Sequence, residues 1–372
     1  MAKVGIITIQ RSELNFGACL QSFALWKYIT ELGHDCKVID LLRPCHAGYR
    51  TSPSFNEKDR SLRGKFRMAV RRLLRRKKAG SRLFAEKKAR FARFNGLPAY
   101  TETYRSVEEL YRAKPVFDVY VTGSDQVWNP DQNFIKDPYF LTFAPTGAKK
   151  LSYASSFGTG QLPEGLKPRY GAWLSDYAAI STREASGARI VEELTGKRAT
   201  VVMDPVFLLP AEQWLSYAER VDGLDPGAFV FLYLLHHNEA ALRYAASVAK
   251  ERGFPLYFVL SEDKRVEVPD ARQLLDVGPK EWLWLVANAG AFVTTSFHGL
   301  AFSLIFRESA TVLMKKGVPT NARIDDLLSA AGLQCARKDV LPDVAALSVS
   351  GGDKDRLAAL IGESREYLKR EI

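Results

Sequence analysis

Residues 291–306 read AFVTTSFHGLAFSLIF, and the order of residue types in this stretch indicates the class of fold. An apolar run at 291–295 is followed by a polar turn, and the turn leads into a second apolar run at 300–306. The first run has the length and composition of a buried strand, and the second continues as a helix. Together they predict one β-α unit of a parallel sheet, with His298 in the turn between strand and helix.

The same unit recurs along the chain. Strands are predicted at residues 4–9, 37–40, 116–122, 150–154, 178–181, 200–203, 229–235, 256–260, 291–295 and 311–314. Helices are predicted at residues 18–32, 188–195, 239–252, 280–289 and 300–306. Strands that alternate with helices form parallel sheets, because each helix carries the chain back to start the next strand in the same direction. The sequence therefore predicts an α/β fold, in which strand 311–314 closes the second sheet.

The length of 372 residues predicts two domains, because a single hydrophobic core stops growing at about 250–300 residues. Residues 222–227, Asp-Gly-Leu-Asp-Pro-Gly, are rich in turn formers and directly precede the point where the strand pattern restarts. We expect an N-terminal Rossmann-like domain at 1–215 and a C-terminal one at 225–345. A helix within 350–372 is expected to pack back on the domains.

The start of the chain has the pattern of a strand, without the basic region and cleavage site of a signal peptide. No apolar run reaches the roughly 20 residues that a membrane span needs. We therefore expect a cytoplasmic protein. The cysteines show no metal-binding spacing, so we expect small buried thiols and no metal site. They are Cys19, Cys36, Cys45 and Cys335.

The positive charge of the chain is concentrated in one segment. Residues 58–93 hold 16 Lys and Arg against 2 acidic residues, a local excess of +14 within a total of +11, which leaves −3 for the remainder. We treat this segment, at about 58–94, as a basic helical insertion in the first domain. Its apolar residues recur at helical spacing. They are Leu62, Phe66, Val70, Leu73 and Leu74.

This insertion has more than one interpretation. A basic amphipathic helix with Phe and Leu opposite its charges has the composition of helices that bind anionic membrane surfaces. A solvated helix whose apolar stripe packs on the domain would have the same pattern. Nucleic acid is not expected as a partner, because the sequence has no recognition helix or aromatic platform around the basic residues.

Polar or glycine-rich turns follow six of the predicted strands. Ligands of open parallel sheets bind beyond the carboxyl ends of the strands, so turns at these ends are candidates for a binding site. Turn formation and helix capping explain each turn taken singly. The turns are residues 15–17 (NFG), 123–129 (GSDQVWN), 152–158 (SYASSFG), 181–184 (STRE), 204–205 (DP) and 294–299 (TTSFHG).

Four side chains in these turns have functional groups that could bind or react with a substrate. His298 is predicted at a helix N-terminus, which lowers an imidazole pKa and suits a residue that exchanges protons near neutral pH. Arg183 has the geometry to bind an anion through two N–H groups, or to form structural ion pairs with Glu184. Asp125 fits a general base, a ligand for sugar hydroxyls or a helix cap. Asp204, before a proline, is favoured as a turn residue.

Taken in order, these turns resemble those of the polysaccharide pyruvyltransferase family, over a region from Asn15 to about Leu328. The resemblance implies a GT-B-like arrangement, with two Rossmann-type doubly wound domains that face each other across a cleft holding the active site. It implies an enzyme that transfers pyruvate from phosphoenolpyruvate to a sugar and forms a ketal, without a metal or organic cofactor. Acceptors in the family are often lipid-linked intermediates of capsule, exopolysaccharide or cell-wall polymers, which would place the protein peripherally at the inner face of the cell membrane.

The resemblance also implies roles for individual residues. We expect His298 to act as the acid and Asp125 to accept a hydroxyl proton or position the sugar. The residues expected to bind the donor are Arg183, Ser296, Gly299 and Arg323. The residues expected to bind the acceptor are Asn15, Gly17, Ser124, Gln126, Trp128, Asn129 and Ser155.

Two positions depart from the family pattern. Some members carry Arg-Leu immediately before the histidine, where this chain has Ser296 and Phe297. Another cation must therefore bind the donor if the chemistry is the same, and Arg183 is our first choice, with Arg323 the second. Two further functions fit the sequence: a GT-B glycosyltransferase that uses a nucleotide sugar, and a non-catalytic saccharide-binding protein at the membrane.

Overall fold

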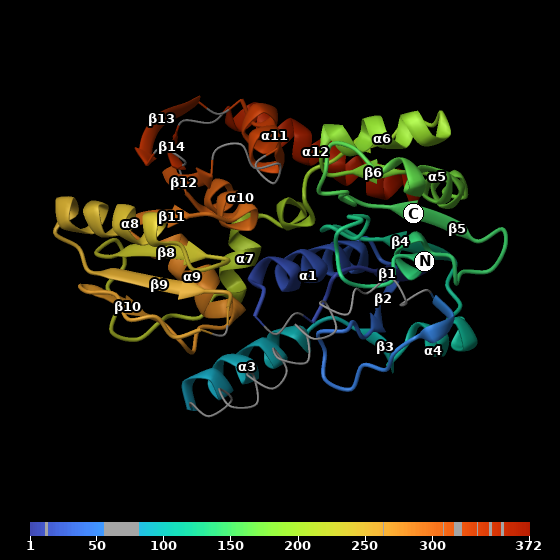
Figure 1. The fold of residues 1–372 in the computed structure, drawn as a ribbon, viewed down its shortest axis with the longest axis horizontal. Coiled ribbons are helices and arrows are strands. Elements are labelled where there is room, and N and C mark those ends of the chain that lie inside the picture. The colour runs from blue at the N-terminus through green and yellow to red at the C-terminus, as the bar shows by residue number, and fades with distance from the viewer. Residues whose placement is uncertain are drawn as a thin grey trace.

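The structure is a computed structural model, and it describes residues 1–11, 14–55, 82–262, 264–307, 309–315, 322–332, 334–341, 344–350 and 353–372. It contains two large sheets, one in each half of the chain, with helices packed around them (Figure 1). The strands of both sheets are parallel except for one C-terminal hairpin. The prediction of an α/β fold with Rossmann-type sheets is confirmed.

The first sheet has the order β3-β2-β1-β4-β5, which is the order of a doubly wound sheet. Its strands are β1 (Lys3–Ile7), β2 (Asp35–Leu41), β3 (Tyr100–Tyr104), β4 (Val119–Thr122) and β5 (Lys149–Ser152). A short parallel pair, β6 (Ser181–Thr182) and β7 (Thr200–Val201), follows on from β5 through isolated bridges. Strand β3 was not predicted, because it lies at the sheet edge and its sequence, YTETY, is too polar to stand out.

The helices of the first half include α1, which has buried residues along most of its length. Asn15 caps it, with the side-chain oxygen accepting from the backbone N–H of Ala18 at 3.2 Å. The helices are α1 (Phe16–Glu31), α3 (Arg82–Asn95), α4 (Val107–Ala113), α5 (Lys167–Ser175) and α6 (Ala185–Thr195). The short 3-10 helices are η1 (Pro53–Phe55), η3 (Asp137–Phe140), η4 (Glu164–Leu166) and η5 (Pro205–Leu208).

The second sheet has the order β10-β9-β8-β11-β12-β14-β13. Its strands are β8 (Val230–Leu234), β9 (Leu256–Leu260), β10 (Ala271–Gln273), β11 (Ala291–Thr294), β12 (Ser309–Lys315), β13 (Gln334–Leu341) and β14 (Val344–Ser350). The expectation that strand 311–314 closes the sheet is wrong, because the antiparallel pair β14 and β13 extends it beyond β12. The two strands of this hairpin follow one another without a helix between them, so they do not have the pattern of a β-α unit.

The helices of the second half are α7 (Ala211–Tyr217), α8 (Glu239–Arg252), α9 (Pro279–Asn288), α10 (Phe297–Phe306), α11 (Ala322–Ala330) and α12 (Lys354–Glu371). Helix α12 returns to the first half of the molecule, where the chain ends (Figure 1). The hydroxyl of Tyr367 donates to the carbonyl oxygen of Ser152 at 3.0 Å, which ties this helix to the end of β5. In the described part of the chain, no helix combines the length and apolar character that crossing a membrane requires.

Apolar side chains from both halves pack together next to α1, which lies between the two sheets (Figure 1). Phe16 contacts Tyr233 and Trp282 from the second half, with ring centroids 5.6 Å apart in each pair. Phe91 on α3 packs against the same ring at 4.8 Å. The two sheets therefore share one buried cluster, which fixes the start of α1 against the second half.

The basic insertion is only partly within the described residues. The apolar stripe predicted at residues 62–74 lies outside them, whereas α3 forms the end of the insertion. The ammonium group of Lys87 on α3 is buried and donates to the carbonyl oxygen of Leu260 at 2.9 Å. Arg90 pairs with Glu281 at 3.1 Å and with Asp276 at 3.4 Å. The end of the insertion thus joins the first half to the second.

Candidate active site

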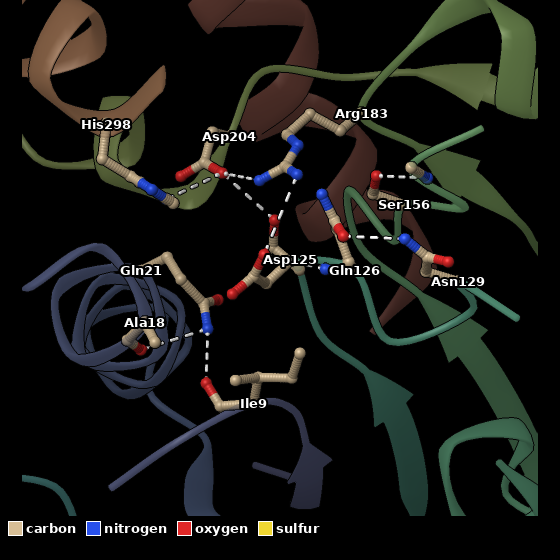
Figure 2. A network of polar contacts seen from close by, with 12 residues as sticks. Ile9, Ala18, Gln21, Asp125, Gln126, Asn129, Ser156, Arg183, Asp204 and His298 are labelled. Carbon is tan, nitrogen blue, oxygen red and sulfur yellow. Dashed lines mark hydrogen bonds and ion pairs between the residues drawn. The ribbon is translucent and has the colours of Figure 1, made fainter. Parts of the chain in front are cut away.

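Side chains that follow four different strands meet at one place between the two halves (Figure 2). Ser124 follows β4, Arg183 follows β6 and Asp204 follows β7, all from the first half. His298 follows β11 and is the second residue of α10, from the second half. Strands β4 and β11 each lie at the position where the strand order of their sheet reverses, which is where doubly wound sheets bind ligands.

Asp204 is the centre of this arrangement. Its Oδ2 atom accepts from Nη1 of Arg183 at 2.9 Å and from the hydroxyl of Ser124 at 3.2 Å. Nε2 of His298 lies 3.6 Å from the same oxygen. The other oxygen, Oδ1, accepts from the backbone N–H of Val206 at 3.2 Å and so caps η5. One fully buried carboxylate thus connects both halves of the molecule.

The Asp204 carboxylate is held in its charged form. Burial alone raises the pKa of a carboxyl group, but His298 and Arg183 more than offset it and hold the Asp204 pKa well below its usual range. A negative charge at this position, 3.6 Å from Nε2 of His298, can orient the imidazole. The pair has the arrangement expected for a histidine that delivers a proton.

Gly17 in the first turn of α1 makes room for the imidazole. A Cβ atom at this position would lie 2.1 Å from Nδ1 of His298, far inside van der Waals contact. Glycine therefore allows the start of α1 to pack against the ring. The structure places Gly17 against His298, and the predicted contact of Gly17 with the acceptor stays a prediction.

Two arginines lie beside this pair. The Arg183 guanidinium sits 4.7 Å from the ring centre of Phe297, and the Arg323 guanidinium of α11 lies 5.9 Å from the same centre. Among the described residues, Nε and Nη2 of Arg183 and Nε of Arg323 are buried without a hydrogen-bond partner. Buried N–H groups are nearly always paired in native proteins, so these three indicate a ligand that accepts hydrogen bonds.

The surroundings shift the pKa values of the two arginines in opposite directions. Burial disfavours the charge on Arg183, but the carboxylates of Asp204, Glu184 and Asp125 more than compensate and raise its pKa. Burial and the neighbouring Arg183 lower the pKa of Arg323 to about 10. An anion bound between the two guanidiniums would relieve their repulsion, which makes this the cationic part of the site.

Asp125 has an uncommon backbone conformation, with φ of 71°. Such left-handed conformations of residues other than glycine cost free energy and concentrate at functional sites. The Asp125 carboxylate is only 14% exposed, and its Oδ1 lies 4.0 Å from Nη2 of Arg183. The conformation turns this carboxylate into the space beside the arginine (Figure 2).

Glu184 supports the loop around Arg183. Its Oε1 atom accepts from the hydroxyl of Ser156 at 2.8 Å and from the backbone N–H of Phe157 at 3.0 Å, while Oε2 lies 3.9 Å from Nε of Arg183. Asp204 and Glu184 were not predicted as site residues, and Asp204 was interpreted as a turn former. Their position at strand ends was the available signal, but small turn residues give the same signal.

The other predicted site residues divide into two groups. Ser124 and Gln126 reach the site: Gln126, with its amide oxygen turned toward Arg323, accepts from both terminal nitrogens at 3.1 and 2.9 Å. In this orientation the amide nitrogen of Gln126 lies 2.8 Å from the side-chain nitrogen of Asn129. Gln126 therefore lies beside Arg323, and its predicted contact with the acceptor stays a prediction.

Residues of the second group have their polar groups occupied within the fold. Asn15 and Ser296 cap α1 and α10, and Gly299 is packed so closely on Thr294 that a Cβ would lie 2.3 Å from its hydroxyl. Trp128 is fully buried and donates to the carbonyl oxygen of Tyr139 at 3.0 Å. The buried hydroxyl of Ser155 donates to the carbonyl oxygens of Thr122 and Gly123. The structure gives these residues packing and capping roles.

Comparison with known families bears on the whole of this region. The sequence model for polysaccharide pyruvyl transferase matches residues 15–307, which include α1, Asp125, Arg183, Asp204 and His298. The chain belongs to the polysaccharide pyruvyl transferase family. As a member of this family, it is a transferase enzyme, and the predicted family and enzyme class are confirmed. Arg323 lies beyond the matched residues.

Three of the solved structures that are similar to this chain share 10% to 13% sequence identity with it. UDP-N-acetylglucosamine 2-epimerase from Rickettsia bellii has 13% identity and a TM-score of 0.42, over 80% of this chain and 74% of that one. The UDP-GlcNAc 2-epimerase of Methanocaldococcus jannaschii, in complex with UDP-GlcNAc and UDP, has 13% identity and a TM-score of 0.44, over 82% of each chain. An alpha-glucosyltransferase in complex with UDP and a 13-mer DNA has 10% identity and a TM-score of 0.40, over 78% and 72%. A search of curated protein sequences gives no significant match.

Proposed function

We propose that this transferase moves the pyruvate group of phosphoenolpyruvate onto two hydroxyls of a sugar, forming a ketal on a lipid-linked polysaccharide intermediate. One observation carries the proposal: two guanidiniums, each with a buried and unpartnered N–H group, lie beside a histidine that is paired with a carboxylate. The family supplies the reaction class, and this geometry fits an anionic donor that must be protonated.

Phosphoenolpyruvate carries a carboxylate and a phosphate, so its binding site needs cations and N–H donors. Arg183 and Arg323 supply both, and planar guanidiniums suit these anions because they present parallel N–H groups. The two arginines stand in for the family arginine that is replaced by Ser296 in this chain. Charge neutralisation is thus assigned to side chains of the enzyme, and the proposal requires no cofactor.

The chemistry needs one proton donor and one proton acceptor. His298 in its protonated form gives a proton to C3 of the enol, while a sugar hydroxyl attacks C2 and passes its proton to Asp125. A bond from C2 to the sugar oxygen forms, and the C2–C3 double bond becomes a methyl group attached to C2. A second sugar hydroxyl then displaces phosphate from C2 and gives its proton to the leaving phosphate, which completes the ketal and releases inorganic phosphate.

Phosphoenolpyruvate is expected to raise the apparent unfolding temperature of the protein, because a ligand that binds only the native state stabilises it by about 2.7 kcal/mol at a hundredfold excess over Kd. The measurement is a thermal shift with phosphoenolpyruvate, UDP-glucose and GDP-mannose in parallel. Arg323→Met removes one guanidinium and is expected to abolish most of the shift. Stabilisation by a nucleotide sugar and none by phosphoenolpyruvate would contradict the proposal in favour of a glycosyltransferase.

An enzyme that modifies a lipid-linked acceptor works at a membrane surface. We infer that the basic insertion binds this surface. Roughly 1 kcal/mol per Lys or Arg near an anionic surface is enough for reversible docking. We expect co-sedimentation with vesicles that contain phosphatidylglycerol at low salt, and release at high salt as the charges are screened. Neutral phosphatidylcholine vesicles are the control, and absence of binding to anionic vesicles would leave the insertion as a solvated helix on the domain.

A further inference from the structure

Gln21 lies in α1 next to the site and takes no part in the reaction steps proposed above. Its side chain is fully buried, and its amide oxygen has no hydrogen-bond partner among the described residues. A buried oxygen that has lost its water and gained no partner costs free energy. An unpartnered oxygen of this kind, beside a site that binds hydrogen-bonding substrates, indicates a donor supplied by the ligand.

The orientation of the Gln21 amide is fixed by its nitrogen. Nε2 donates to the carbonyl oxygen of Ile9 at 2.9 Å and to that of Ala18 at 3.2 Å. Carbonyl oxygens only accept, so the nitrogen must face them and the amide oxygen must point the opposite way. In Figure 2 this oxygen points from α1 toward Asp125.

A short chain of hydrogen bonds connects Gln21 to the Asp125 loop. The same Nε2 donates to the hydroxyl of Thr8 at 3.1 Å, and this hydroxyl donates to the carbonyl oxygen of Ser124 at 2.8 Å. Ser124 immediately precedes Asp125. These hydrogen bonds hold the side chain of Gln21 and the Asp125 loop together at the carboxyl ends of the neighbouring strands β1 and β4.

We propose that the amide oxygen of Gln21 binds a hydroxyl of the saccharide acceptor. This inference rests on the function proposed above and adds a residue to its acceptor side. The N–H donors of Arg183 and Arg323 form one set, which faces the anionic donor substrate, and the oxygens of Gln21 and Asp125 form a second set, which faces the acceptor. In the second set the Gln21 oxygen is unpartnered, while Oδ1 of Asp125 accepts from the backbone N–H of Gln126 at 2.8 Å. A neutral hydroxyl fits the second set, because an anion there would be repelled by the carboxylate.

Gln21→Met tests the proposal, because methionine keeps the length of the side chain and removes the amide. Gln10→Met is the matched control. Gln10 is also a buried glutamine with an unpartnered oxygen, but its nitrogen donates to Asp40 on β2, on the other side of β1 from Asp125. Crystal structures of the wild type and both variants are determined in the presence of glycerol, a small neutral polyol, as the probe.

A glycerol hydroxyl is expected within hydrogen-bond distance of the Gln21 oxygen in the wild type and in Gln10→Met, and absent in Gln21→Met. Glycerol that binds equally well to Gln21→Met is an adventitious additive only and overturns the proposal. A protein group, or a water that stays on the Gln21 oxygen in glycerol, also overturns it. This readout does not depend on phosphoenolpyruvate, so it decides the role of Gln21 even if the proposed function fails.

Kinetics provide a second readout. Phosphate release from phosphoenolpyruvate is measured with the methyl glycosides of glucose, galactose and mannose as acceptor probes. Gln21→Met is expected to raise the apparent KM for the acceptor probe about three- to tenfold, the effect of one neutral hydrogen bond. The thermal shift with phosphoenolpyruvate should be unchanged. A variant that loses this shift while the wild type keeps it would assign Gln21 to the donor side or to folding, and would overturn the proposal.

Discussion

Replacing His298 with alanine is expected to lower kcat for phosphate release from phosphoenolpyruvate about 10²–10⁴-fold, the usual contribution of a proton-transfer group. The imidazole lies 3.6 Å from the buried Asp204 carboxylate, and the same carboxylate pairs with Arg183. Binding of phosphoenolpyruvate should persist, because the guanidiniums that bind it are unchanged. The thermal shift and the rate, measured on the same preparation, separate the two effects.

Gly17→Ala is the matched variant for His298. It leaves the histidine in the sequence but places a methyl group where the imidazole lies, so it should lower kcat by displacing the ring. Near-normal phosphate release by His298→Ala would contradict the assignment of the acid. If the wild type released no phosphate, and His298→Ala left saccharide binding unchanged, the results would favour the non-catalytic saccharide-binding function.

Asp204→Asn is expected to reduce both activity and stability. The neutral amide cannot form the ion pair with His298, so kcat should fall by a factor of about 10²–10⁴, as when the carboxylate of a histidine–carboxylate pair is neutralised. Arg183 is left as a buried cation without its closest partner, and breaking such a pair costs about 3–5 kcal/mol of unfolding free energy. Urea unfolding and steady-state kinetics measure the two effects. Ser124→Ala, which removes one neutral hydrogen bond to the same oxygen, is the control and should cost about 1 kcal/mol.

The stability loss in Asp204→Asn should depend on pH. The folded state holds the Asp204 pKa below its unfolded value of about 3.9, so the wild type gains stability from this carboxylate at every pH above that value. The gain is lost as the pH falls from about 4 toward the folded pKa. The difference between wild type and variant should therefore be constant from about pH 5 to 8 and shrink below about pH 4. A difference that grows at low pH would show that the buried carboxylate is not ionised in the native state.

Much of the fold was readable from local patterns. The polar turn at His298 between an apolar strand and an apolar helix correctly placed β11 and α10, and repetition of this unit gave the α/β class. Edge strand β3 was missed because its sequence carries no apolar run. The hairpin of β13 and β14 was also missed: β13 is largely polar, and β14 was not recognised although its residues 344–347 are apolar. The candidate site was found in the right turns for the same local reason: carboxyl ends of parallel strands lie along one edge.

The roles of individual side chains in those turns were harder to predict. Trp128 and Ser155 stand in turns that reach the site, yet both are buried with their hydrogen bonds made inside the fold. Gln21 lies in a helix that looked simply apolar, and its amide oxygen faces the site. Whether a side chain points into the site or into the core depends on the residues that pack around it. Those residues come from distant parts of the sequence.

The amino-acid sequence by itself determined the class of fold, the turns that form the site and the identity of His298 and Arg183 as candidates. Only the tertiary structure decided that Asp204 joins them, since its partners Ser124 and His298 lie 80 residues before it and in the other half of the chain. The physical reason is the range of the interactions. Apolar periodicity and turn formation act between neighbours in sequence, whereas ion pairs, close packing and burial depend on which segments meet after folding.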